Sequence, residues 1–312
     1  MKVSILIPLY NDWESGAELI GRIRSVMSSI ACEEFRCFIV DDASTANCPE
    51  SLKHHFGNVE IIRLNRNVGH QRAITIGLCH LSAHHTPDHV VVMDGDGEDK
   101  PEDIPLLLEE SAKKNGHIIF GQRKKRFESS TFRLFYAAYK SVFRILTGKT
   151  ISFGNFCAIP FSRLQDLVFV PDLWNHFSGG IIRTGIPYST LSLDRGKRYR
   201  GESKMNFVSL VLHGLGAISV HTDTLAVRML LSSLIMICLL SIGIIVVAGI
   251  RFFTPLAIPG WASFVVIGLL ILIFQAFLIS LLLVFNVLNY RTQRHIIPAL
   301  EYTNFIRSVA KW

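Results

Sequence analysis

An apolar run meets a cluster of carboxylates in the segment Val90-Val91-Val92-Met93-Asp94-Gly95-Asp96-Gly97-Glu98-Asp99. Because no polar residue alternates through the run, it is typical of a parallel strand that is buried on both faces. The carboxylates would then lie at the carboxyl edge of an α/β sheet, where such folds bind ligands. Asp94 and Asp96 can present oxygens to one hard cation, which could neutralise a diphosphate leaving group. A solvated acidic loop is the alternative, and the rest of the sequence decides between the two.

Two apolar stretches account for the high hydrophobicity of this 312-residue chain, which is 49% hydrophobic with a mean hydropathy of +0.35. Met229–Ile250 and Trp261–Leu288 are each long enough to cross about 30 Å of hydrocarbon. Arg251 is the only charged residue between Arg228 and Arg291. A globular core of this size needs no pair of nearly uncharged helices this long. We therefore predict a transmembrane hairpin rather than two buried helices.

The net charge of +7 is compatible with either nucleic acid or anionic lipid as a partner. Basic residues gather in Arg123–Arg133, in Arg195–Lys204 and after the second span, and such flanking clusters favour lipid over nucleic acid. Positive charge on both outer flanks predicts a multi-pass protein of the inner (plasma) membrane with a cytoplasmic catalytic domain. The six cysteines show no metal-ligand spacing, and we expect them to be reduced.

Residues 1–121 alternate short apolar runs with segments of helical periodicity. The apolar runs predict strands over Val3–Ile7, Phe35–Val40, Val59–Leu64, His89–Met93 and Ile118–Phe120. The periodic segments predict helices over Leu19–Ile30, Gln71–Leu81 and Ile104–Lys114. Such alternation indicates the α/β class, with a mostly parallel, Rossmann-like sheet and crossover helices.

Two further segments are predicted to be amphipathic helices in the membrane interface. Aromatic residues recur at three- and four-residue steps through Thr131–Thr147, beside basic residues. A helix that faces the core is nearly as compatible with this periodicity. Met205–Val220 leads directly to the first span. The predicted domains are a cytoplasmic catalytic domain over residues 1–228, a transmembrane hairpin over 229–290 and a cytoplasmic basic tail over 291–312.

Polar loops follow four of the predicted strands, at residues 8–12, 41–44, 65–70 and 94–99. Asparagine, aspartate, glycine and proline occupy turns for backbone reasons, so any one loop alone could be an ordinary turn. The carboxyl ends of parallel strands meet at one edge of a sheet, so the four loops should gather there. A shared ligand site explains the set better than four separate turns.

The loop motifs occur in a fixed order along the chain. They are Pro8-x-Tyr10-Asn11, Val40-Asp41-Asp42-x-Ser44, Asn67-x-Gly69, Asp94-x-Asp96 and Arg198-x-x-Gly201-x-Ser203-Lys204. This set, followed by two apolar spans, resembles the family 2 glycosyltransferases with a GT-A fold. Within that family the chain looks like the polyprenyl-phosphate glycosyltransferase group, which includes dolichyl-phosphate mannose synthases and bactoprenol glucosyltransferases. The resemblance covers nearly the whole chain.

The resemblance implies a donor site at the shared edge of the sheet. The residues that it implies for the nucleotide sugar are Pro8, Tyr10, Asp12, Asp42, Asn67, Gly69 and Asp94. The resemblance also implies that the donor diphosphate binds through Mg²⁺ or Mn²⁺, and that the ligands of this ion are Asp94, Asp96 and Glu98. Asp12 stands where the family usually has glutamate, and Glu98 stands where it has a glutamine that helps to coordinate the metal. A carboxylate can serve as a metal ligand equally well.

The resemblance also implies that Arg198, Ser203 and Lys204 grip the phosphate of the acceptor lipid, and that Arg198 and Lys204 act in catalysis with Asp94 and Asp96. A lipid monophosphate carries about −1.5 to −2 charges. It is therefore already a nucleophile and needs cationic positioning rather than a general base. Arginine offers a planar fork and lysine a point charge for this purpose. A basic stretch that merely touches lipid headgroups is the alternative.

One departure concerns a segment in which relatives commonly carry an acidic residue, where this chain has Gly154-Asn155-Phe156. Asn155 can form hydrogen bonds but carries no charge, which leaves the sugar specificity open. Gly95 and Gly97 also make the carboxylate loop, residues 94–99, more flexible than the bulkier residues of the family would. The histidine pairs at 54–55 and 84–85 are assigned no role.

We therefore expect an inverting glycosyltransferase that moves a sugar from a nucleotide-diphosphate donor, a UDP-sugar by preference, to undecaprenyl phosphate or a similar polyprenyl phosphate. A processive polysaccharide synthase is one alternative, but such relatives carry a Gln-x-x-Arg-Trp-like element that this sequence lacks. A non-catalytic membrane scaffold that binds nucleotide sugars is another. A homo-oligomer is also expected, because relatives form tetramers.

Overall fold

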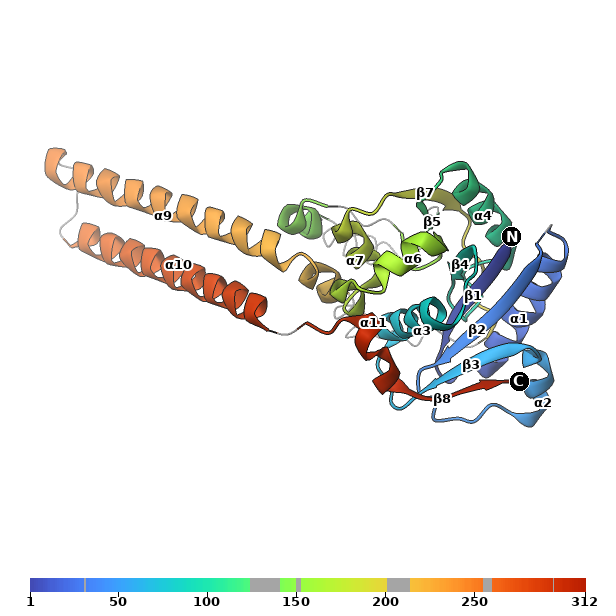
Figure 1. Ribbon diagram of the computed structural model, residues 1–312. Coiled ribbons are helices and arrows are strands. Elements are labelled where there is room, and N and C mark those ends of the chain that lie inside the picture. Colours follow the sequence, from blue (N-terminus) through green and yellow to red (C-terminus); the bar gives the residue numbers. More distant parts are fainter. Residues whose placement is uncertain (31, 124–140, 150–152, 201–213, 255–259, 294) are drawn as a thin grey trace. The chain divides into compact units, whose positions relative to one another are not determined.

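The computed structural model describes residues 1–30, 32–123, 141–149, 153–200, 214–254, 260–293 and 295–312 (Figure 1). These residues form two compact units. The first unit contains the described residues up to 123, those between 153 and 220, and those from 295 to 312. The second contains residues 141–149 and the described residues between 221 and 293.

One mixed sheet forms the centre of the first unit, with its strands in the order β7-β5-β6-β4-β1-β2-β3-β8 (Figure 1). The strands are β1 (Lys2–Leu9), β2 (Glu34–Asp41), β3 (Val59–Leu64), β4 (His89–Val92), β5 (Ile118–Arg123), β6 (Cys157–Pro160), β7 (Tyr188–Leu193) and β8 (Ile306–Lys311). Strands β4, β1, β2 and β3 run parallel to one another, and β7 runs parallel to β5. β6 runs antiparallel to β4 and β5, and β8 runs antiparallel to β3. The predicted α/β class with a mostly parallel sheet is confirmed.

Helices cover both faces of this sheet, which explains the continuous apolar runs of its central strands. Successive side chains of a strand point to opposite faces. Leu6 of β1 therefore joins the core beneath α3 (His70–His84), whereas Ile5 and Ile7 join the core beneath α1 (Trp13–Ser28) and α4 (Ile104–Lys113). The remaining elements of the unit are α2 (Glu50–Lys53), η1 (His54–Phe56), η2 (Pro101–Asp103), α6 (Phe161–Leu167), η3 (Pro171–Trp174), α7 (Phe177–Thr184), α11 (Pro298–Glu301) and η4 (Tyr302–Phe305).

The sequence predicted β1 to β5 but not β6, β7 or β8. Each of the five expected strands is present, and the helix expected from Leu19 already begins at Trp13. β6 has only four residues and ends at a proline, so its sequence shows no strand period. β8 lies at the edge of the sheet and has mostly exposed residues without alternation, so burial imposes little pattern on it.

The C-terminal residues, which we expected to form a separate basic tail, belong to the first unit from residue 295 onwards. β8 pairs with β3 over Glu60–Leu64. The indole of Trp312 stacks on Trp13 with ring centroids 6.0 Å apart, and the Arg63 guanidinium lies 5.3 Å from the Trp312 ring centroid. The end of the chain is thereby fixed to α1 and β3.

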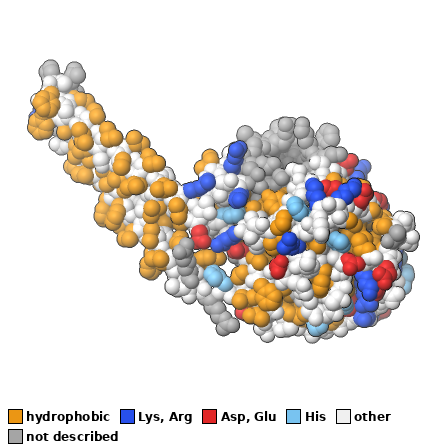
Figure 2. Space-filling model, turned by 45° about the horizontal axis from the view of Figure 1, so that its top comes forward, with side chains coloured by type: hydrophobic (Ala, Val, Ile, Leu, Met, Phe, Trp, Pro, Cys, Tyr) orange, Lys and Arg blue, Asp and Glu red, His pale blue; other side chains and the backbone are white. Residues whose placement is uncertain are grey.

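The second unit contains two long apolar helices, α9 (Thr222–Phe253) and α10 (Trp261–Thr292), which contact each other along their length. Each has a mean hydropathy of 2.9 in its most apolar window, and most of their side chains are exposed. Figure 2 shows hydrophobic side chains covering these helices. Ser233 and Ser280 form a hydrogen bond between the two. By length and composition both helices could cross a membrane.

The segments expected to be interfacial helices are described only in part. Residues 141–147 are helical and belong to the unit of α9 and α10, where the Phe143 ring meets His221 edge to face at 6.1 Å. Residues 214–219 are helical in the first unit. The remainder of both segments lies outside the described residues. Their place at a membrane interface stays a prediction.

Candidate active site

Three parallel strands end at the same edge of the sheet and deliver three polar loops there. Leu9 of β1 is paired with Asp41 of β2, and Leu6 of β1 is paired with Val92 of β4. The loops that begin at residues 10, 42 and 93 are therefore neighbours. The loop after β3, which leads into α3, completes the set, because β3 runs parallel to β2.

Asn11 joins the first two loops. Its backbone N–H donates to Ser44 Oγ at 2.8 Å, and its Oδ1 accepts from the Ala46 N–H at 2.9 Å. Asn11 has a φ of 52°, in the left-handed region that asparagine tolerates better than most residues. Pro8 is buried at the end of β1, whereas 40% of Tyr10 is exposed. The tyrosine ring is thus free to meet a planar ligand beside the loops.

Asp42 ties the second loop to the start of α3. Its Oδ1 accepts from the Val68 N–H at 2.7 Å, and its Oδ2 accepts from the Gly69 N–H at 3.0 Å. Burial raises the pKa of Asp42, and the two backbone donors offset only part of that effect. Gly69 has a φ of +89°, and Asn67 beside it is exposed. The carboxylate therefore fixes the backbone at Val68 and Gly69, directly after Asn67, the other loop residue expected at the donor.

Asp94 contacts a histidine that the sequence analysis did not select. His70, the first residue of α3, lies with its Nε2 3.1 Å from Asp94 Oδ1 and 3.0 Å from the Asn155 amide nitrogen. Burial disfavours the charged form of His70, but the carboxylates of Asp94, Asp99 and Asp96 outweigh burial and raise its pKa. The position of His70 directly after the Asn67-x-Gly69 motif was the available signal.

Arg198 brings together two acidic loops. Its guanidinium lies 3.1 Å from Asp12 Oδ2 and 3.4 Å from Asp96 Oδ2. Burial raises the pKa of Asp96, and the nearby carboxylates add to this effect, while Arg198 and the Glu98 N–H oppose it. Arg195 forms a second ion pair of the same kind with Glu98. Arg198, which belongs to the basic segment Arg195–Lys204, thus lies beside Asp96, one of the predicted metal ligands.

The backbone of the basic segment packs directly on the carboxylate loop. The Gly196 N–H donates to the Glu98 carbonyl at 2.8 Å, and the Tyr199 N–H donates to the Asp96 carbonyl at 3.0 Å. A Cβ on Gly196 would lie 2.4 Å from the Gly97 carbonyl oxygen, and a Cβ on Gly97 would lie 2.5 Å from the Tyr199 ring. Both glycines are needed for the close contact between the basic segment and the carboxylate loop. Gly97 therefore sets the distance between these two segments, whereas the sequence had suggested that it only makes the carboxylate loop more flexible.

The remaining predicted acceptor residues, Ser203 and Lys204, lie outside the described residues. The proposed metal ligands Asp94, Asp96 and Glu98 share one loop, and each keeps part of its side chain exposed. Their oxygens are the donor type that Mg²⁺ and Mn²⁺ prefer. Among the described residues, however, ligand atoms of three side chains converge within 4.8 Å of one another only at Glu60, His80 and His85, so the role of Asp94, Asp96 and Glu98 as ligands of one ion stays a prediction.

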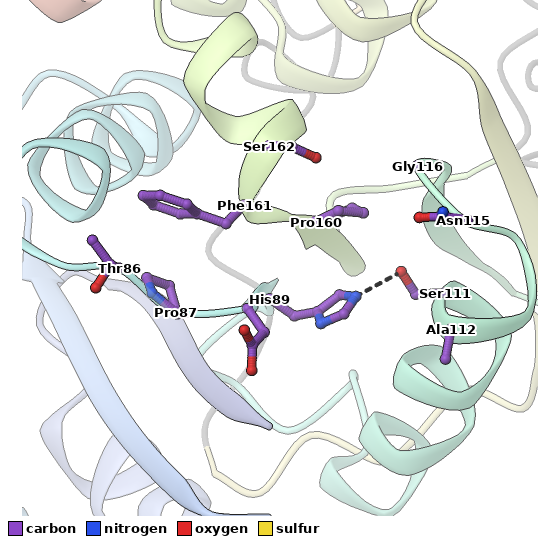
Figure 3. Close-up of a pocket in the computed structure, with 11 residues that line it drawn as sticks. Thr86, Pro87, His89, Ser111, Ala112, Asn115, Gly116, Pro160, Phe161 and Ser162 are labelled. Carbon is purple, nitrogen blue, oxygen red and sulfur yellow. Dashed lines mark hydrogen bonds between the residues drawn. The ribbon is translucent and has the colours of Figure 1, made fainter.

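Two other features of the first unit lie away from these loops. A polar cavity of about 410 Å³ is lined by the loop before β4, the end of α4 and the start of α6, with His89 and Ser111 in its wall (Figure 3). A cluster of Glu60, His80 and His85 gathers at the start of β3 and the end of α3. Both lie toward the amino ends of the parallel strands, opposite the carboxylate loop.

The arrangement of polar loops at the carboxyl edge of a largely parallel sheet defines a nucleotide-binding α/β protein. Residues 4–167, more than half of the chain, match Glycosyl transferase family 2, and the protein belongs to this family. The predicted family is confirmed. The protein is accordingly a glycosyltransferase that uses a nucleotide-sugar donor. The polyprenyl-phosphate group within the family stays a prediction.

Solved structures agree on the fold. Mannosyl-3-phosphoglycerate synthase from Rubrobacter xylanophilus is 13% identical with a TM-score of 0.53, over 70% of this chain and 72% of that one. Glucosyl-3-phosphoglycerate synthase from Mycobacterium tuberculosis, solved with Mn²⁺, UDP-glucose and phosphoglyceric acid, is 14% identical with a TM-score of 0.50, over 72% of this chain and 79% of that one. At these identities the likeness concerns the fold alone.

Proposed function

We propose that the protein transfers a sugar from a nucleotide-diphosphate donor, a UDP-sugar by preference, to a polyprenyl phosphate at the cytoplasmic face of the inner membrane. The contact of Arg198 with both Asp12 and Asp96 carries this proposal. A guanidinium at that place lies beside the carboxylates proposed for the donor diphosphate. It can therefore draw an acceptor phosphate toward the sugar.

The donor half of the site rests on the loops after β1, β2 and β3. Tyr10 offers an exposed ring for the base, and Asp42 holds Gly69 at the start of α3. A bound Mg²⁺ or Mn²⁺ would be held by Asp94, Asp96 and Glu98 and would neutralise charge on the diphosphate. His70 contacts Asp94 in the same region, and the nearby carboxylates raise its pKa.

The acceptor half rests on the basic segment. A phosphomonoester carries about −1.5 to −2 charges, so its oxygen can attack without losing a proton. The chain then has to hold two phosphates that repel each other. Arg195 and Arg198 here balance Glu98 and Asp96, and Lys204 follows them in sequence. Their task is to orient the acceptor and to offset its charge.

A lipid acceptor is supported by the second unit. α9 and α10 are apolar along more than 20 residues each, and most of their side chains are exposed. Burying such a surface in water-free surroundings is strongly favourable. A glycosyltransferase with these helices is suited to an acceptor that is itself held in a bilayer.

The proposal is tested by incubating the purified protein with undecaprenyl phosphate and a panel of nucleotide sugars, and by measuring the lipid-linked product by mass. One sugar should be transferred to the lipid phosphate. Asp96→Ala should abolish transfer while membrane insertion is retained. Unchanged turnover in this variant would refute the metal assignment. A long glycan chain would indicate a processive synthase, and binding without any product would indicate a scaffold.

The basic segment has its own matched control. Arg198→Ala should lower kcat/KM by about 100-fold, the usual cost of removing a donor to developing charge. Lys204→Ala should raise the KM of the acceptor far more than that of the donor. Arg200 pairs with Glu14 and is largely exposed, so Arg200→Ala should change either constant less than about twofold. Equal losses in the Arg198 and Arg200 variants would mean that the segment acts only as a basic patch.

A further inference from the structure

Glu60, His80 and His85 converge on one point of the first unit. Glu60 Oε1 lies 2.8 Å from His80 Nε2 and 3.5 Å from His85 Nε2. One ligand atom from each of the three residues lies within 4.8 Å of the others. Glu60 is 8% exposed and His80 is 6% exposed. We propose that these three residues form a binding site for a transition-metal cation, with Zn²⁺ preferred, separate from the carboxylate loop.

The donor set identifies the kind of cation. Two imidazole nitrogens and one carboxylate oxygen are a recurrent ligand set for Zn²⁺, with a water molecule as the fourth ligand. Imidazole favours zinc and its neighbours, whereas oxygen-only sites favour magnesium and manganese. The Glu60 cluster and the carboxylate loop of Asp94 and Asp96 therefore select different ions.

The distances suit this ion after a small adjustment. With metal–ligand bonds of about 2.05 Å, two ligands of a tetrahedral zinc lie about 3.3 Å apart. The separation of Glu60 Oε1 from His85 Nε2 is 3.5 Å, and the 2.8 Å separation from His80 has to open by about 0.5 Å. Rotation about side-chain bonds is sufficient for a change of this size.

A hydrogen-bonded pair without a metal is the competing explanation. The short contact between Glu60 and His80 satisfies that pair without any third group. His85 approaches the same carboxylate oxygen at 3.5 Å, which is longer than an ordinary hydrogen bond. Its ring is held there by an edge-to-face contact with Phe38 at 4.7 Å. The second imidazole is thus positioned toward the oxygen by packing, as a metal ligand would be.

The site lies on rigid elements and far from the donor loops. Glu60 is in β3, His80 is in the last part of α3 and His85 is the residue that ends this helix. His70, at the start of α3, is about 15 Å away along the helix axis. A metal here would fix the end of α3 to β3, so its expected effect is on stability rather than on the chemistry of transfer.

The test uses the full-length protein without a histidine tag, stripped with chelator and then equilibrated with Zn²⁺ in detergent. We expect about one tightly bound zinc per chain that survives in Asp96→Ala and is lost in His80→Gln and in His85→Gln. The zinc affinity should fall at least about 100-fold, more than second-shell changes usually cost. When Co²⁺ replaces Zn²⁺ in the unmodified protein, the visible absorption spectrum should be that of a tetrahedral Co²⁺ ion. This measurement tests the site without any substitution.

The neighbouring histidine provides the matched control. His84 packs its ring against His80 with centroids 4.6 Å apart, but its Nε2 faces the Tyr302 hydroxyl at 3.3 Å and it is not one of the three converging residues. His84→Gln should therefore keep the zinc that His85→Gln loses. Equal zinc binding in the His84 and His85 variants, or a zinc content well below one per chain in the unmodified protein, would overturn the proposal. Loss of zinc in Asp96→Ala alone would place the ion at the carboxylate loop instead.

Discussion

Gly196→Ala should impair transfer without touching a charged side chain. A Cβ at this position would lie 2.4 Å from the Gly97 carbonyl oxygen, and ordinary contacts begin at 3.4 Å. The basic segment and the carboxylate loop must therefore separate by about 1 Å, which moves Arg198 by a similar distance from Asp96. A displacement of that size at a reacting centre costs about 100-fold in rate, or about 2.7 kcal/mol.

The assay is kcat/KM for the sugar that the donor panel identifies, measured beside thermal unfolding. Gly21→Ala is the matched control, because a Cβ at this exposed position of α1 meets nothing within 4 Å. It should leave transfer unchanged and stabilise the helix by about 0.5–1 kcal/mol. If Gly196→Ala keeps kcat/KM within about threefold of the unmodified enzyme, the close packing of the two loops does not set the position of Arg198, and the reasoning is refuted.

Three further changes are expected to act on the first unit. Trp312→Ala should lower the free energy of unfolding by about 2 kcal/mol, because it removes the stack on Trp13, and thermal unfolding measures this. Asp42→Asn leaves one of two backbone donors without its acceptor, so it should cost about 1–3 kcal/mol and raise the donor KM. Burial lowers the pKa of His89 below its usual 6.5. The folded state therefore binds fewer protons than the unfolded state, and the free energy of unfolding should fall as pH drops below about 6.5. Urea titrations at several pH values should show a smaller fall in His89→Gln than in the unmodified protein.

The parallel half of the fold could be predicted from the sequence because both of its faces are covered. Because β1 and β4 are buried on both faces, their sequences are apolar nearly throughout, and such runs can be recognised without a structure. β7 alternates exposed and partly buried residues, and β8 has mostly exposed ones, so their pairing depends on partners distant in the chain. The link between β3 and β8 joins residues about 250 positions apart, and no local pattern records it.

Some residues of the candidate site could likewise be predicted from the sequence, and others could not. Asp42, Asp94 and Asp96 were predicted because a strand ends just before each loop, and the order of strands places such loops together. His70 and Asn155 could not be linked from the sequence, because they are 85 positions apart in the chain and meet only in the folded structure. The double contact of Arg198 with Asp12 and Asp96 likewise depends on how residues 194–200 lie on the carboxylate loop.

Charge balance explains why an asparagine suits position 155. His70 already faces Asp94, and two further carboxylates raise its pKa. If the acceptor is the proposed polyprenyl phosphate, with about −1.5 to −2 charges, a carboxylate at position 155 would add one more negative charge where that phosphate approaches the donor diphosphate. The amide of Asn155 keeps contact with His70 at 3.0 Å and accepts from Gln71 without that repulsion. The proposed phosphate nucleophile needs no general base, so under this proposal an asparagine here removes an unfavourable charge and no required proton acceptor.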